Sequence, residues 1–203
     1  MDLFTAADGD ARCGWAGGTE QYLAYHDTEW GFPVDDDVRL FEKVCLEGFQ
    51  SGLSWRTILQ KRQNFRVAFA GFDFHRIASF GPADVDRLLG DAGIVRHRGK
   101  IEATINNAVR AVDLQAEAGS LAAYFWSFEP DPGEVDPPQS ATTSPTSVAL
   151  ARDLKRRGWR FFGPTTAFAF MQAMGLINDH APGCVVRDRV ASARAGFASP
   201  AAT

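Results

Sequence analysis

The stretch LLGDAGIVRHRGKI, residues 88–101, places a short turn containing glycines between two helical patterns. Upstream of it, Pro82 stands where the first residue of a helix belongs, and apolar residues follow at helical spacing. Downstream, apolar residues at the same spacing predict a long helix from about Lys100 to Glu117. The stretch therefore predicts two helices joined by a tight turn.

The rest of the interior also has the apolar spacing of helices. The start and stop signals are acidic or hydroxyl caps, prolines at first helical positions, and glycines at the ends. Beyond the helices of the opening stretch, they predict helices after Asp35–Asp37, from Ser54 to Phe69, over Leu121–Phe128, from Ser144–Pro145 to Arg157, and from Pro164 to Gly175. Residues 129–144 are rich in Pro, Asp, Ser and Thr and predict a loop. No alternating run is long enough to predict a strand, so the expected fold class is all-α.

Length and composition set the outer bounds. The chain has 203 residues, 45% of them hydrophobic, and a formal net charge of −4. We expect one domain over residues 12–188, with flexible tails at 1–11 and 189–203. No apolar run is long enough to span a membrane, and the acidic start does not resemble a secretory signal, so we expect a cytoplasmic protein. Three cysteines argue against a disulfide framework.

Cysteine and histidine occur near both ends of the predicted domain. Cys13 and His26 lie near its start, and His180 and Cys184 lie near its end. Four such side chains can form a closed tetrahedral zinc site, which would tie the two ends together. Spacing alone leaves the alternative open, because distant Cys and His residues are more often unrelated. Cys45, on an apolar helical face, illustrates a cysteine that only fills the core.

A second cluster combines aromatic residues with a carboxylate. Between residues 15 and 30 the chain is dense in aromatic residues, yet it lacks clear helical or strand periodicity; Glu47 and then Trp55 follow further on. The rings could cover the core, or they could form the wall of a pocket for a flat ligand. Glu47 could be solvated, or it could accept a hydrogen bond from a cationic or amino-bearing ligand. Spacing does not choose between these interpretations.

The turn of the opening stretch is locally basic, with Arg96, His97, Arg98 and Lys100. It resembles a helix-hairpin-helix motif, in which backbone amides and a helix N-terminus bind a DNA phosphate. The net charge of −4 argues against nucleic-acid binding in general. A single basic face would still allow it, with few phosphate contacts and a modest dependence on salt.

Together these segments resemble the DNA-3-methyladenine glycosylase I family, over roughly residues 12 to 185. The matching pieces, in order, are RCGW (12–15), YHD (25–27), EWG (29–31), CLEG (45–48), GLSW (52–55), DAGI (91–94), RHRGKI (96–101), WSF (126–128), FMQA (170–173), GL (175–176) and NDH (178–180). The chain departs from the pattern in both tails and in the Pro-rich loop around residues 130–138. We expect these departures to affect the DNA footprint and not the pocket.

The resemblance implies a helix-hairpin-helix glycosylase fold with a structural zinc ion on Cys13, His26, His180 and Cys184. It places the base pocket on Trp15, Tyr22, Tyr25, Trp30, Glu47 and Trp55, with Glu47 as the catalytic residue. It implies contacts to DNA from Gly52, Leu53, Gly93, Arg98, Gly99 and Lys100; the Gly52–Leu53 loop would fill the gap left by a flipped nucleotide. Asp179 is expected to orient His180 or its neighbouring backbone.

The implied activity is hydrolysis of the N-glycosidic bond of 3-methyladenine in double-stranded DNA, by base flipping, leaving an abasic site. No lysine lies among the matched pocket positions, so we predict a monofunctional enzyme without lyase activity. We also expect a monomer, because no heptad stripe is evident. The alternatives are a broader alkyl-purine glycosylase, a zinc-stabilised module that only binds DNA or a damaged base, and a helical zinc protein unrelated to nucleic acid.

Overall fold

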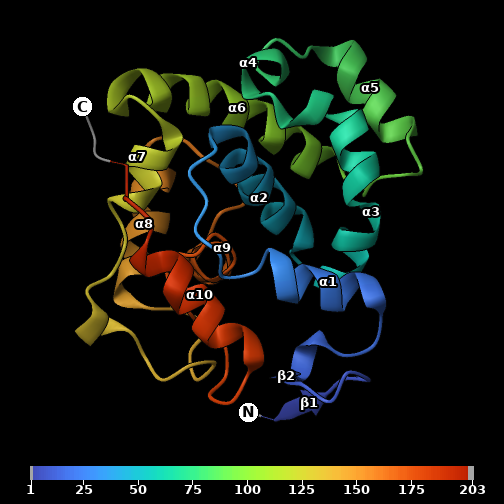
Figure 1. Ribbon diagram of the computed structural model, residues 1–203. Helices are drawn as coiled ribbons and strands as arrows, with labels where there is room; N and C mark the ends of the chain where they lie inside the picture. Colours follow the sequence, from blue (N-terminus) through green and yellow to red (C-terminus); the bar gives the residue numbers. More distant parts are fainter. Residues whose placement is uncertain (1, 201–203) are drawn as a thin grey trace.

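The computed structural model describes residues 2–200 and is built mostly of helices around one core (Figure 1). The helices of this described part are α1 Glu20–Thr28, α2 Asp37–Gln50, α3 Trp55–Ala68, α4 Phe74–Ile77, α5 Pro82–Gly90, α6 Arg98–Ala118, α7 Leu121–Trp126, α8 Pro145–Arg156, α9 Pro164–Ala173 and α10 Val185–Ala195. Short 3₁₀ turns cover Gly14–Ala16, Ala70–Phe72 and Pro132–Glu134. The all-α prediction is confirmed, and Ser54, Ser144 and Pro82 begin helices where the sequence indicated.

Helix α2 forms the centre of the fold. It contacts α3, α6, α7 and α9, and Figure 1 shows it inside the ring that the other helices make. The side chain of Asp36 caps its start by accepting a hydrogen bond from the backbone N–H of Arg39 at 2.7 Å. Because neighbours surround α2, its charged residues Glu42, Lys43 and Glu47 are buried together with its apolar ones. Charges in such a position need partners.

The chain ends hold more regular structure than the sequence indicated. Strand β1 (Leu3–Thr5) pairs antiparallel with β2 (Ala11–Cys13), so that Leu3 lies opposite Cys13. The sequence had not predicted these two short strands, which leave the all-α class unchanged. Three-residue strands are too short for alternation to reveal, and tertiary contacts decide whether they form. Residue 1 of the expected N-terminal tail lies outside the described residues.

Three helices were not predicted from the sequence: the four-residue α4, and the longer α1 and α10. Aromatic side chains from α1 contribute to a cavity, so the helix lacks the single apolar stripe that periodicity detects. In α10, Val186 and Val190 are fully buried, and Arg194 forms an ion pair with Glu129 at 2.7 Å. This helix runs to Ala195, well into the expected flexible tail 189–203, of which residues 201–203 lie outside the described part.

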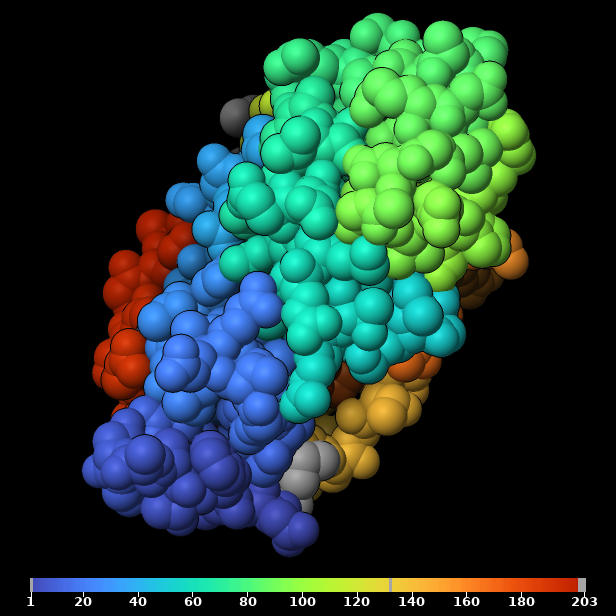
Figure 2. Space-filling view, turned by 90° about the vertical axis from the view of Figure 1, so that its right-hand side faces the viewer, coloured from blue at the N-terminus to red at the C-terminus, as the bar shows by residue number. Residues whose placement is uncertain are grey.

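The opening stretch forms the predicted pair of helices, α5 and α6, joined by a turn. The side chain of Asp91 accepts a hydrogen bond from the N–H of Gly93 at 2.7 Å, and His97 caps α6 by accepting from the N–H of Lys100 at 3.2 Å. Figure 2 shows this hairpin in light green at the opposite end of the face from the N-terminal residues. Within residues 2–200, no helix is long and apolar enough to cross a membrane.

Candidate active site and metal centre

A cavity of about 290 Å³ opens between α1, α2, the start of α3, α9 and the loop that precedes α8. Its wall consists of Trp15, Tyr22, Tyr25, Trp30, Lys43, Glu47, Gln50, Trp55, Gln139, Ala141, Thr142, Ala169, Gln172 and Asp179. The structure thus brings all six sequence-predicted pocket residues around one space. Segments separated by more than a hundred residues form its opposite sides.

Aromatic rings shape this cavity through edge and tilted contacts. The ring of Trp15 meets Trp30 edge-on, with centroids 4.9 Å apart, and meets Tyr22 at 5.3 Å. In the same wall, the rings of Tyr25 and Trp55 lie 5.3 Å apart at 46°. Such rings offer flat apolar faces to a planar ligand, and those faces also attract cations. The indole Nε1 of Trp55 is buried without a hydrogen-bond partner among the described residues.

An ion pair that the sequence analysis missed lies in the same wall. The ammonium of Lys43 lies 2.7 Å from Oε1 of Glu47, one turn further along α2. It also donates to the hydroxyl of Tyr25 at 2.9 Å, and it lies 3.4 Å from the ring centroid of Trp55. The i, i+4 spacing of Lys43 and Glu47 within an apolar helix was the signal that could have revealed it. The matched pocket positions contain no lysine, but the structure adds Lys43 to the wall of the pocket.

The loop before α8 forms another part of the wall that the sequence analysis did not assign. The backbone N–H of Gln139 donates to Asp179 at 2.7 Å, and the side chain of Gln172 donates to the same carboxylate at 2.5 Å. Burial raises the pKa of Asp179 above its ordinary value. The residues that follow the Pro-rich loop thus reach the pocket, whereas the described side chains of residues 130–138 are not among those that line it. Asp179 holds this loop, and it is Asn178 whose side-chain oxygen lies 3.2 Å from Nδ1 of His180.

Behind the aromatic wall lies a cluster of cysteine and histidine side chains. The ligand atoms of Cys13, His26 and Cys184 all lie within 4.8 Å of one another, and all three residues are buried. His180, the fourth predicted ligand, is not part of this group of three, but its ring packs beside the group, 4.9 Å from the ring of His26. The Nε2 atom of His180 is buried without a hydrogen-bond partner in the described part of the chain. The cluster thus joins β2 and α1 to the segment between α9 and α10.

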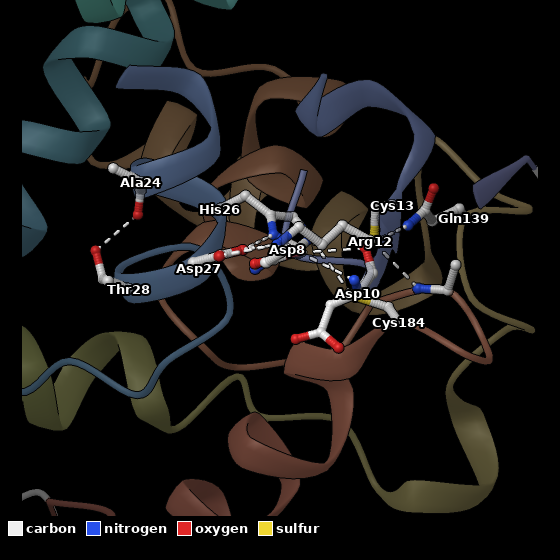
Figure 3. Close-up of polar contacts among 11 residues, drawn as sticks. Asp8, Asp10, Arg12, Cys13, Ala24, His26, Asp27, Thr28, Gln139 and Cys184 are labelled. Atoms are coloured by element: carbon white, nitrogen blue, oxygen red, sulfur yellow. Dashed lines mark hydrogen bonds and ion pairs between the residues drawn. The ribbon is translucent and has the colours of Figure 1, made fainter. Parts of the chain in front are cut away.

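The surroundings of the cluster suit a metal ion. Nδ1 of His26 lies 2.7 Å from Asp27, which in turn binds Arg12, as Figure 3 shows. Gln139 and the N–H of Ala181 donate to the sulfur of Cys13 at 3.1 and 3.3 Å. A carboxylate behind a histidine ligand and N–H groups directed at a cysteine sulfur are common around zinc. Gln139 therefore connects this cluster to the pocket.

Burial also sets the protonation of these groups. It lowers the pKa of His180 to about 3 and that of His26 below its ordinary value, so both rings are neutral and have a lone pair to share. It raises the pKa of Cys13 to about 12, so a bound cation would have to stabilise the thiolate. Two neutral imidazoles and two thiolates form a donor set that zinc prefers. The residues present fit such an ion.

The residues predicted to contact DNA lie in two turns. Gly52 has φ +78° with open space around it, and Leu53 beside it is 42% exposed. Gly93 lies in the turn of the hairpin, and Gly99 lies in the first turn of α6. The side chain of Arg98 is exposed and lies 3.4 and 3.5 Å from Asp86 and Glu102.

Lys100 differs from the other predicted DNA contacts because its side chain is buried. Its ammonium donates to the backbone oxygens of Phe49 at 2.9 Å and Ser51 at 2.6 Å. Lys100 thus fastens the turn that carries Leu53 to the start of α6. Its side chain aligns two surface elements, and two of the three N–H groups of its ammonium are used by these bonds.

Comparison with known proteins adds independent findings. Residues 15–188 match the family model described as methyladenine glycosylase. The chain is 46% identical over 177 residues to DNA-3-methyladenine glycosylase 1 of Escherichia coli K12, covering 85% of this chain and 95% of that protein. It is 43% identical over 177 residues to DNA-3-methyladenine glycosylase of Haemophilus influenzae, covering 85% and 96%. The solved structure of 3-methyladenine DNA glycosylase I from Staphylococcus aureus superposes with a TM-score of 0.82 at 34% identity, covering 87% of this chain and 96% of that one.

Proposed function

The chain belongs to the methyladenine glycosylase family, and from this premise we propose that it removes 3-methyladenine from alkylated double-stranded DNA in base-excision repair. The single observation that carries the proposal is the cavity whose wall contains Glu47 together with the rings of Tyr25 and Trp55. An aromatic wall with one carboxylate suits a flat base that has a positive charge and an amino group.

The reaction begins with the methylated nucleotide outside the base stack, because a base inside the duplex cannot enter such a pocket. Methylation at N3 makes the base cationic and weakens its bond to the sugar. Trp55 and Tyr25 stack on the base, and Glu47 accepts a hydrogen bond from its amino edge. Unmodified adenine lacks the charge, and its glycosidic bond is more stable, so it is left in place.

Bond breaking sends the electron pair of the N-glycosidic bond to the base, which leaves as neutral 3-methyladenine. Water adds to the sugar carbon and loses a proton, which yields an abasic site. The enzyme is monofunctional, although Lys43 lines the pocket. Its ammonium is buried and held by Glu47 and Tyr25, so it lacks the free lone pair that attack on the sugar would need.

Two turns contact the DNA. Leu53, at the exposed tip beside Gly52, fills the gap left by the flipped nucleotide. The α5–α6 hairpin, with Gly93, Gly99 and Arg98, binds a phosphate through backbone N–H groups at the start of α6. Lys100 supports this surface by fastening the two turns together.

A structural zinc ion is held by Cys13, His26, His180 and Cys184. Its role is to stabilise the fold behind the pocket, and it takes no part in the reaction. The enzyme works as a monomer, because exposed large apolar side chains among the described residues are scattered over separate elements. The two named relatives come from bacteria, whose DNA lies in the cytoplasm, and we propose the same location for this protein.

The direct test is release of free bases from duplex DNA treated with a methylating agent, resolved by chromatography. We expect rapid release of 3-methyladenine, with 7-methylguanine left in the DNA. Release of 7-methylguanine at a similar rate would indicate a broader alkyl-purine glycosylase. No release by folded, zinc-loaded protein would contradict the proposed activity and point to a protein that only binds DNA or a damaged base.

A further inference from the structure

Lys43 is a buried charge in the pocket that the proposed reaction does not use. Its side chain and that of Glu47 are each only 6% exposed. Burial lowers the pKa of Lys43 below its ordinary value, and the carboxylate of Glu47 opposes this effect. The ammonium lies over the ring of Trp55, a position where a cation gains from the electrons of the ring. Lys43 thus interacts with all three groups proposed to bind the cationic base: Glu47, Tyr25 and Trp55.

The neighbouring carboxylates leave Glu47 as the partner of Lys43. On the other side of Lys43 a cavity of about 20 Å³ is bordered by Glu29 and Glu42. Glu29 is already paired with Arg62 at 2.7 Å, and Glu42 with Arg66 at 3.0 Å. A pocket with Glu47 alone would attract any cation, whereas Lys43 and Glu47 together have no net charge.

The substrate and the product differ in charge. The methylated base is a cation while it is bonded to the sugar, and it is neutral once the N-glycosidic bond has broken. The positive charge moves during this step from the base toward the sugar carbon and ring oxygen. Electrostatic repulsion falls with distance. A fixed positive charge in the wall of the base pocket therefore raises the free energy of the bound cationic nucleotide more than that of the state in which the charge has moved to the sugar.

We infer that the Lys43 ammonium drives the positive charge off the methylated base, by raising the free energy of the bound cationic base more than that of the neutral base that leaves. Lys43 is thereby a rate-contributing and specificity-determining residue of the pocket. Glu47 keeps the ammonium in place and still accepts from the amino edge of the base. The inference rests on the proposed function, since it concerns the same reaction.

Two small molecules separate charge from shape. The 3,9-dimethyladeninium ion has a fixed positive charge and a methyl group where the sugar would be, whereas 3-methyladenine is neutral. Binding of each to the intact, zinc-loaded protein is measured by calorimetry. For Lys43→Met we expect binding of the cation to tighten by about tenfold, with binding of the neutral base changed much less. The conservative Lys43→Arg variant should retain the preference of the original protein.

Removing Lys43 also leaves Glu47 unpaired, so a double-mutant cycle isolates the repulsion. The variants Glu47→Gln and Lys43→Met/Glu47→Gln differ only at position 43, in a pocket without the carboxylate. Because loss of Glu47 lowers the pKa of Lys43 further, the comparison is made over a pH series that extends to the range where Lys43 is protonated. We expect the ratio of cation to neutral-base affinity to rise in the double variant relative to Glu47→Gln. Lys155→Met, which removes an exposed lysine from α8, is the matched control and should leave both affinities unchanged.

Single-turnover excision from methylated DNA gives the second readout. Lys43→Met should slow the excision step by about tenfold at saturating enzyme, even though the cation binds more tightly; damage to the fold would weaken binding as well. An unchanged affinity ratio within the cycle, or weaker binding of the cation by Lys43→Met, would overturn the inference. If the original protein releases no 3-methyladenine, the proposed function fails instead, and the binding ratios still report on Lys43 alone.

Discussion

The cysteine–histidine cluster and the α5–α6 hairpin show two opposite ways in which this chain builds a functional region. The cluster gathers residues from both ends of the domain into a dry interior, so Cys13 and Cys184 depend on almost the whole fold to meet. The hairpin spans residues 82–118, is held by its own turn, and exposes Arg98 to water. We therefore expect changes at the cluster to affect stability, and changes at the hairpin to affect DNA affinity with little effect on stability.

The largest effect should come from removing the proposed metal ligands. Cys184→Ala, or stripping zinc with a chelator, should lower the free energy of unfolding by about 3–5 kcal/mol, because two distant segments lose their common anchor. The melting temperature should then fall by roughly 10 °C, measured by differential scanning fluorimetry, with metal content measured by atomic emission.

Cys45→Ala is the matched control for this change. Cys45 is also buried, but it lies on α2 and does not belong to the cysteine–histidine cluster. Its replacement should lower the free energy of unfolding by only about 1 kcal/mol, with no change in zinc content. Equal destabilisation by the two variants would show that the cluster is not a metal centre.

A glycine beside the cluster should give the next largest effect. Gly31 has φ +86°, and a Cβ there would lie 2.8 Å from Cε1 of His180. Gly31→Ala should therefore destabilise by about 2–3 kcal/mol, through backbone strain and displacement of the histidine ring.

Gly52→Ala has the same backbone strain, at φ +78°, but meets open space. It should destabilise by only about 1 kcal/mol, measured by urea unfolding. The difference between the two variants measures how tightly the cluster is packed. If Gly52→Ala were as harmful as Gly31→Ala, the steric argument would be wrong.

Glu47 lies in the pocket between the two regions, and its replacement should act mainly on selectivity. Glu47→Gln keeps the shape of the side chain but removes its charge. The ratio of the single-turnover excision rate of 3-methyladenine to that of unmodified adenine should therefore fall by about tenfold or more. Lys43 loses its partner in this variant, which should also destabilise the fold by about 1–2 kcal/mol. Unchanged excision of 3-methyladenine by folded Glu47→Gln would remove Glu47 from its proposed role.

The smallest change in stability should come from the hairpin. Arg98 forms only exposed ion pairs, with its side chain 56% exposed, so Arg98→Ala should alter stability by less than about 0.5 kcal/mol. The affinity of the Arg98→Ala variant for duplex DNA should still fall several-fold. The slope of affinity against salt concentration should decrease by the amount expected for about one phosphate contact. Fluorescence anisotropy over a salt series measures both, and an unchanged salt slope would place the DNA elsewhere.

What the sequence determined by itself is local. Helices α2, α3, α5, α6, α8 and α9 follow from apolar spacing and from caps such as Ser54, because these signals act within a few residues of one another. The turn at Gly93 was visible for the same reason. The family motifs then selected the ligand and pocket residues, which spacing alone had left undecided.

Only the tertiary structure decided the features that depend on distant partners. It folded β1 onto β2, brought the loop with Gln139 into the pocket wall, and turned the ammonium of Lys100 onto the end of α2. It also buried Lys43 against Glu47 and Trp55, although a lysine on a helix is usually solvated. Whether a charged side chain meets water or a partner depends on which elements pack against its helix, and local sequence does not encode that packing.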